Sequence, residues 1–292
     1  MTPAAIILAV ALLLPPVHAG AGDLRVLASF LPMYLFAHNV VGDTPGVYLE
    51  IMLPPSLGCP HDYALSPGDM RKIAAADLFI ANGQGMEEFL GAPVRKANPR
   101  VRIVETAAGV PTLRGEEGGH AGINPHTWVS PRNAILQVRA IEKALSEAYP
   151  PGAPSFRRNA DGYVAKLTAL VREFEASAGE MRGRNIVTSH NVFDYFARDL
   201  GLTIVGEIEE TPGQEPSAGE VSKLIRAIRE RKAAAVFREP QSPERLAAMI
   251  AREAGVPLRT LDPVSTGSTA PSTYEDVMRK NLATLIEVLA KR

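Results

Sequence analysis

Short apolar segments alternate with longer amphipathic segments along most of the chain. Eight of the short segments contain five to seven residues each, a length typical of strands. They span residues 24–30, 48–53, 77–82 and 101–105 in the first half, and 185–190, 203–208, 234–239 and 257–262 in the second. Because most of these segments are apolar and rich in β-branched residues, we expect strands buried on both faces, as in parallel sheets.

The segments between the predicted strands carry signals for helix starts. Three serines precede a proline, which places a capping hydroxyl before a proline at the first helical position. They are Ser66, Ser130 and Ser242. Two further serines have the spacing of a capping box, namely Ser217 with Glu220 and Ser272 with Glu275. The alternation predicts an α/β protein of two (β/α)4 lobes with mainly parallel sheets, residues 20–150 and 184–292.

The segment between the two predicted lobes, residues 151–183, has the pattern of one long helix. Its apolar residues recur at helical spacing and mark a single face. They are Phe156, Tyr163, Leu167, Leu170, Val171 and Phe174. A helix over residues 153–181 would be about 40 Å long at the usual rise per residue. We expect it to brace both lobes.

The first residues differ in character from the rest of the chain. Residues 4–14 form an unbroken apolar run of 11 residues, too short to span a bilayer as a helix. Two prolines end the run, and Val17, His18 and Ala19 then fit a small-x-small cleavage site. No Lys or Arg precedes the run, and a buried N-terminal strand or helix is the alternative. We expect residues 1–19 to be a secretory signal peptide.

Composition and charge exclude several classes of function. The chain has 292 residues, of which 46% are hydrophobic and 22% charged, as in ordinary soluble proteins. A net charge of −1 gives no electrostatic case for binding nucleic acid or an anionic membrane. The single cysteine, Cys59, excludes an internal disulfide and lies too far from the signal to carry a lipid. We expect a monomeric periplasmic protein that is not a lipoprotein.

Four side chains with metal-binding chemistry lie at or beyond the carboxyl ends of predicted strands. His61 follows the second strand, His126 follows the fourth, His190 ends the fifth, and Asp262 ends the eighth. Ligands of open α/β sheets bind at this edge. If the two lobes face each other, we expect these four residues to converge in the cleft between them.

Three neutral imidazoles and one carboxylate form a four-coordinate set that suits zinc. A closed set of four protein ligands leaves no position for a catalytic water, which favours holding the metal over using it. Each residue also has a plainer interpretation: a loop histidine is usually exposed or hydrogen-bonded, and Asp262 before Pro263 can start a turn. Tyr63 and Trp128 either shield the site from water or simply pack in the core.

Other candidate residues have a weaker case. Cys59 is a soft donor two residues before His61, and Glu239 ends the seventh strand as a candidate hydrogen-bond partner of a ligand. His120 lies in a Gly- and Glu-rich loop, where a solvated position is expected. His38 lies in a predicted helix and is interpreted as structural.

Six motifs occur in the order found in one known family. They are "PHDYALSPGDMRKIAAADLFIANGQGMEEFL", "NPHTWVSPRNAI", "SHNVFDYFARDLGL", "QEPSAGEVSKLI", "VFREPQ" and "LDPVST". With these motifs the chain resembles the solute-binding proteins of bacterial zinc and manganese ABC importers, the ZnuA/TroA-like group. The resemblance covers nearly the whole chain after residue 19.

The resemblance implies two lobes joined by one long helix, with a metal between them that is delivered to an ABC permease in the inner membrane. It maps the metal ligands onto His61, His126, His190 and Asp262, with Glu239 or a water as the alternative fourth ligand. A histidine at position 190 favours zinc, because manganese binders of the group tend to carry a carboxylate there. Many zinc members have a long His- and acid-rich loop, which here is only "RGEEGGHAG". This reduction argues against a strong metal-gathering role for the loop.

Two alternatives to a zinc importer component stay open at this point. The first is an exported zinc hydrolase with Asp262 or Glu239 as general base. It would need an open coordination position and a substrate pocket. The second is a Mn²⁺ or Fe²⁺ carrier, or a metal-dependent adhesin, on the same fold.

Overall fold

The chain forms two sheets of four parallel strands each, in a computed structural model that describes residues 22–58, 60, 63–87, 91–114, 122–209 and 216–289. The first sheet has the order β2-β1-β3-β4 and the second the order β6-β5-β7-β8. The strands are β1 (Leu24–Ala28), β2 (Val47–Ile51), β3 (Leu78–Ala81), β4 (Arg102–Glu105), β5 (Asn185–Thr188), β6 (Thr203–Glu207), β7 (Val236–Arg238) and β8 (Leu258–Thr260). All eight predicted strands are therefore confirmed, with ends trimmed by a few residues.

Helices follow the strands as the alternating pattern predicts. They are α1 (Leu31–Val41), α2 (Pro67–Ala75), α3 (Gly91–Ala97), α4 (Pro131–Ala148), α6 (Asp194–Leu200), α7 (Ala218–Glu230), α8 (Glu244–Ala254) and α9 (Thr273–Leu289), with short 3₁₀ turns at η2 (Thr127–Val129), η3 (Pro150–Gly152) and η4 (Asn191–Phe193). The side chains of Ser66, Ser130 and Ser217 cap α2, α4 and α7, as predicted. α9 begins directly after Ser272, also as predicted.

The predicted cap at Ser242 is wrong. α8 begins at Glu244, its N-cap residue is Pro243, and no side chain caps it. Ser242 is instead held in the turn after β7, where its N–H donates to the carbonyl of Glu239 and its own carbonyl accepts from Arg238. The turn delays the start of the helix by one residue.

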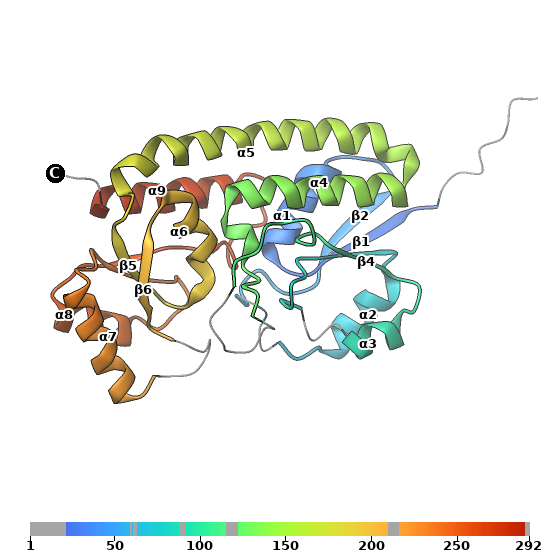
Figure 1. Cartoon of the computed structure of the whole chain (residues 1–292). Helices are drawn as coiled ribbons and strands as arrows, with labels where there is room; N and C mark the ends of the chain where they lie inside the picture. Colours follow the sequence, from blue (N-terminus) through green and yellow to red (C-terminus); the bar gives the residue numbers. More distant parts are fainter. Residues whose placement is uncertain are drawn as a thin grey trace, which may run out of the picture.

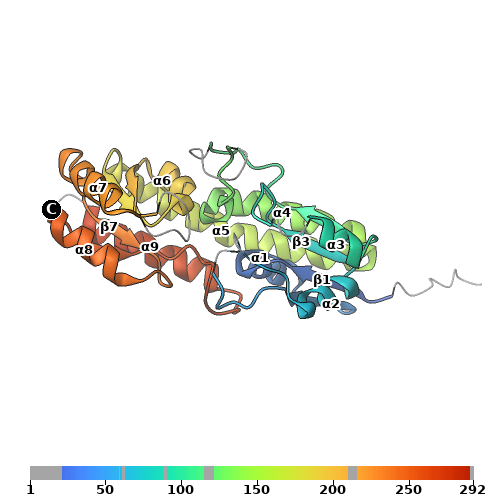
Figure 2. The same ribbon diagram turned by 90° about the horizontal axis from the view of Figure 1, so that it is seen from below.

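α5 (Ala153–Met181) has 29 residues, with the bounds that the periodicity predicts. Figure 1 shows it running along one side of both sheets, with α9 beside it. Its apolar face is buried, and Tyr163 donates to Glu275 of α9 at 3.3 Å. Figure 2 shows from below how the two groups of elements lie end to end along this helix.

The two halves share one hydrophobic core. Phe36 of α1 and Tyr274 of α9 meet edge to face, with ring centroids 5.0 Å apart, although they belong to opposite halves of the sequence. A second, smaller core cluster lies between β6, β7, α7 and α8. Among the described residues no helix is both long and apolar enough to cross a membrane.

Candidate metal centre

His126 lies in the loop between β4 and α4, directly before η2, with a side chain that is 1% exposed. Its backbone N–H and its ring Nδ1 both lie 2.9 Å from Oδ1 of Asn124. Because this amide oxygen can only accept, Nδ1 carries the proton and donates. The tautomer is therefore fixed, and Nε2 is the nitrogen that bears the lone pair.

Asn124 also joins the loop of His126 to the second half of the chain. Its Nδ2 donates to the carbonyl of Asn191 at 2.7 Å and to Oδ2 of Asp194 at 2.8 Å. Its own carbonyl accepts from the hydroxyl of Tyr195 at 2.8 Å. These contacts bring the loop after β4 against the loop after β5. That second loop carries His190.

His190 follows β5 directly, and its ring centroid lies 5.1 Å from that of His126. Its Nδ1 is 2.8 Å from Oε1 of Glu239, in a pair that is nearly inaccessible to water. Burial by itself would lower the pKa of His190, but Glu239, with smaller contributions from Glu207 and Glu209, outweighs it, so the pKa is raised above the ordinary value. An imidazole paired with a carboxylate in this way is typical of metal-ligating histidines.

Glu239 follows β7, the strand next to β5 in the sheet, and its side chain is 2% exposed. Its second oxygen, Oε2, accepts from Nε2 of Gln241 at 2.7 Å. Both carboxylate oxygens are thus engaged by side chains. The pair of Glu239 and His190 lies where the connections of the sheet reverse direction, which is the usual ligand position in such sheets.

Asp262 follows β8 and is partly buried. Its Oδ1 accepts from the backbone N–H of Val264 at 2.8 Å. Burial raises the pKa of its carboxyl and the Val264 N–H opposes this, while the charge of Glu239 raises the pKa and that of Lys280 lowers it. Val264 has a φ of 61°, and a buried β-branched residue in this region stores about 1–3 kcal/mol of strain.

Trp128 connects the loop of His126 with the loop of Asp262. Its indole Nε1 donates to the carbonyl of Pro263 at 2.7 Å, and its carbonyl accepts from the hydroxyl of Tyr274 at 2.7 Å. Its ring also lies 5.4 Å from that of His126. Trp128 packs in the core, where its side chain is fully buried, and its contact with His126 leaves a shielding role a prediction.

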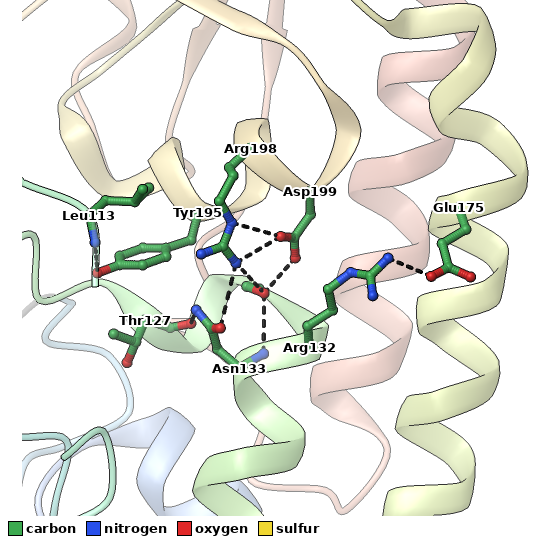
Figure 3. Close-up of polar contacts among 9 residues, drawn as sticks. Leu113, Thr127, Arg132, Asn133, Glu175, Tyr195, Arg198 and Asp199 are labelled. Carbon is green, nitrogen blue, oxygen red and sulfur yellow. Dashed lines mark hydrogen bonds and ion pairs between the residues drawn. The ribbon is translucent and has the colours of Figure 1, made fainter. Parts of the chain in front are cut away.

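A polar cluster attaches α6 to the start of α4 (Figure 3). The hydroxyl of Ser130 donates to Asp199 and accepts from the backbone N–H of Asn133, so one group both caps α4 and binds α6. Arg198 pairs with Asp199 and reaches Oδ1 of Asn133 at 3.5 Å. The loops that carry His126 and His190 therefore precede two helices that are hydrogen-bonded to each other.

Several predicted residues lie outside the described part of the chain: His18 and the rest of the expected signal peptide, Cys59, His61 and His120. Within the described residues no three His, Cys, Asp or Glu side chains form a group that could hold a metal. The described structure thus brings His126 next to His190, and the charge of Glu239 acts on the pKa of Asp262.

Sequence reasoning missed Asn124 and Gln241. Asn124 had a local signal, because an asparagine two residues before a backbone N–H commonly accepts from it in an Asx turn. Gln241 had no such signal, since its partner is identified only by the fold. Tyr63, which the sequence predicts together with Trp128 either to shield the site or to pack in the core, donates to Asp69 in the capping box of α2.

Comparison with known proteins agrees with this architecture. Residues 26–288 match the family model described as zinc-uptake complex component A, periplasmic. The chain belongs to this family. Among curated members of the zinc-uptake family, it is 31% identical to the zinc-binding lipoprotein AdcA of Streptococcus pneumoniae over 280 residues, which cover 90% of this chain and 55% of AdcA. It is 29% identical to the high-affinity zinc uptake system protein ZnuA of Bacillus subtilis, covering 92% of this chain and 88% of ZnuA.

The chain spans about half the length of the AdcA proteins it matches. Solved structures of the family agree with the fold over almost the whole chain. The solute-binding protein FpvC from Pseudomonas aeruginosa in complex with Ni²⁺ has a TM-score of 0.82 at 28% identity, with 91% of this chain and 97% of FpvC covered. A zinc-bound ZnuA deletion mutant has a TM-score of 0.80 at 25% identity, with 92% of this chain and 99% of that chain covered.

Proposed function

We propose that the protein captures Zn²⁺ in the periplasm and delivers it to an ABC permease in the inner membrane. The ligands are His61, His126, His190 and Asp262. Zinc is the cargo of this protein, and manganese is its closest competitor. Family membership and the zinc-binding relatives support the proposal.

The observation that carries the proposal is the pairing of His126 with His190. Their rings are 5.1 Å apart and come from opposite halves of the chain. Each ring has its Nδ1 held by an oxygen acceptor, Asn124 in one case and Glu239 in the other. Nε2 is therefore the nitrogen that each ring offers to a metal, and imidazole nitrogens suit zinc better than manganese.

The hydrogen bonds favour Asp262 over Glu239 as the carboxylate ligand. Both oxygens of Glu239 are engaged by the side chains of His190 and Gln241. In the described parts of the chain Asp262 has only Oδ1 hydrogen-bonded, to Val264. Asp262 can thus offer Oδ2 with no hydrogen bond to these residues to give up, whereas each oxygen of Glu239 already accepts one.

A carrier fits these residues better than a hydrolase does. Four protein ligands fill a tetrahedral zinc site and leave no position for an activated water. Glu239 is one of the two candidate general bases, and its carboxylate oxygens already interact with the side chains of His190 and Gln241. We further propose that residues 1–19 are removed on export and that the mature chain is monomeric and carries no lipid.

The test is a titration of the purified protein with a zinc-competing chelator. Wild-type protein should bind one zinc ion tightly, and His126→Ala should weaken that affinity by at least about 100-fold, which corresponds to about 2.7 kcal/mol. His38→Ala serves as a matched control, because His38 lies on α1 beside Tyr34 and belongs to no proposed ligand set. Equal affinities of His126→Ala and wild type would reject the site.

A parallel assay separates the carrier from the hydrolase. The zinc-loaded protein should hydrolyse ester, peptide and phosphate substrates no faster than buffer with the same zinc concentration. A robust rate that disappears in His126→Ala would establish the hydrolase instead.

A further inference from the structure

We propose that Gln241 sets the metal preference of the site by holding Glu239 in place as the partner of His190, away from the metal. The proposal rests on the zinc site described above and adds a residue that determines its specificity. Gln241 acts through Glu239, so it is a positioning residue rather than a ligand.

The contacts of Glu239 are the first part of the argument. Oε1 lies 2.8 Å from Nδ1 of His190, and Oε2 accepts from Nε2 of Gln241 at 2.7 Å. The side chain is 2% exposed, so water has little access to replace either partner. To turn toward a metal, the carboxylate would have to break at least one of these bonds in a buried setting, which is costly.

The turn that carries Gln241 is itself fixed. Nη1 of Arg238 donates to the carbonyls of Glu239, Pro240 and Ser242, at 2.9, 3.4 and 3.4 Å. These bonds hold the backbone on both sides of Gln241. The turn therefore holds the side-chain amide of Gln241 in place to donate to Glu239, and a precisely positioned site requires such support.

Gln241 also stands at an opening between the two halves. It lines a pocket of about 540 Å³ together with Pro55 and Ser56 from the first half, and with Pro240, Thr266 and Gly267 from the second. The backbone N–H of Gly267 donates to the carbonyl of Pro55 at 2.9 Å, which joins the two sides. Gln241 therefore lies between this pocket and the buried pair of Glu239 and His190.

Releasing Glu239 would change the chemistry offered to the metal. A second carboxylate near Asp262 adds hard oxygen donors, which manganese prefers, to a set dominated by imidazole. His190 would at the same time lose the acceptor that fixes its ring. Both changes weaken zinc relative to manganese.

The experiment compares Gln241→Leu with Thr266→Val. Both residues line the same pocket, and Gln241 donates to Glu239, whereas the described structure has no hydrogen bond between Thr266 and Glu239. Dissociation constants for Zn²⁺ and Mn²⁺ are measured by chelator competition, and the visible absorption of the Co²⁺-loaded protein reports the coordination number. Gln241→Leu should lower the preference for zinc over manganese by at least about 10-fold and weaken the strong bands of four-coordinate cobalt, whereas Thr266→Val should change neither. An unchanged ratio and cobalt spectrum in Gln241→Leu overturns the inference.

A double variant tests whether the effect passes through the carboxylate. In Glu239→Gln the amide oxygen can still accept from His190, but residue 239 is no longer a charged oxygen ligand. Adding Gln241→Leu in this background should leave the metal ratio unchanged. A fall of the ratio in both backgrounds overturns the inference. If wild type and Thr266→Val themselves fail to bind zinc, the proposed function fails instead.

Discussion

The two sheets have the same strand order, and each joins the ends of its two central strands through a buried glutamate. In the first sheet Glu87 accepts from the backbone N–H groups of Asn82 and Gly83 after β3, and from the hydroxyl of Ser29 after β1. In the second sheet Glu239 after β7 pairs with His190 after β5. A buried glutamate between the ends of the two central strands thus fixes backbone in one half and orients an imidazole in the other.

The glutamate of the first half also acts on the site, but indirectly. Asn82, which donates to Glu87, uses its side-chain amide to donate to the carbonyl of Pro125 and to accept from the hydroxyl of Thr127. These are the two neighbours of His126 in the chain. We therefore expect changes at Glu87 to affect stability first, and changes at Glu239 to affect metal binding first.

The largest expected effect is stabilisation by zinc, because its proposed ligands come from both halves. At free zinc about 1,000-fold above the dissociation constant, linkage adds about 4 kcal/mol to the free energy of unfolding. Melting curves should show a clear rise with zinc in wild type and in Glu87→Gln, and little rise in His190→Ala. An unchanged melting temperature of wild type at saturating zinc would rule out a metal site between the two halves.

The second effect concerns pH and the buried glutamate of the first half. Burial raises the pKa of Glu87 from 4.5 to about 7, although Asn82, Gly83 and Ser29 oppose the rise. The folded state then holds this proton more tightly than the unfolded state, so its contribution to stability is complete below pH 4.5 and is lost as the pH rises toward 7. The full difference is on the order of 3 kcal/mol.

The measurement is the free energy of unfolding of metal-free wild type and Glu87→Gln by urea between pH 4.5 and 8. Because the amide does not titrate, the variant should gain on wild type steadily up to about pH 7 and then run parallel to it. A constant difference at every pH would contradict a shifted Glu87.

The third effect concerns the glutamate of the second half, Glu239, and is a loss of zinc affinity. Glu239→Ala leaves Nδ1–H of His190 without its acceptor, so zinc affinity should fall by about 10–100-fold. Glu87→Gln should stay within about threefold of wild type, since Asn82 and Pro125 separate its carboxylate from His126. Chelator competition at pH 7.5 measures both. Equal losses in the two variants would mean that the two carboxylates do not have distinct roles.

The sequence predicts the framework well, because its signals are local and repeat along the chain. The face of α5 is defined by apolar spacing over 29 residues, and its bounds match. The cap at Ser242 failed because Arg238 and Glu239 hold that serine in a turn, a contact that the Ser-Pro signal does not contain.

The site was only partly predictable, for a physical reason. Strand ends predicted that His126 and His190 converge, because parallel strands of each sheet end at one edge and the two edges were expected to face each other. The partners of these histidines depend on contacts between distant segments, such as Asn124 with Asn191 across 67 positions. The left-handed conformation of Val264 was also hidden, since β-branched residues disfavour it.

The only tryptophan of the chain lies within this set of contacts. Trp128 is fully buried, its ring faces His126, and its N–H bonds to the residue that follows Asp262. Indole emission depends on the polarity and hydrogen bonding around the ring, so tryptophan emission from this protein reports one place, beside the proposed metal site. If zinc binds there, its loading and release can be followed in real time without any attached dye.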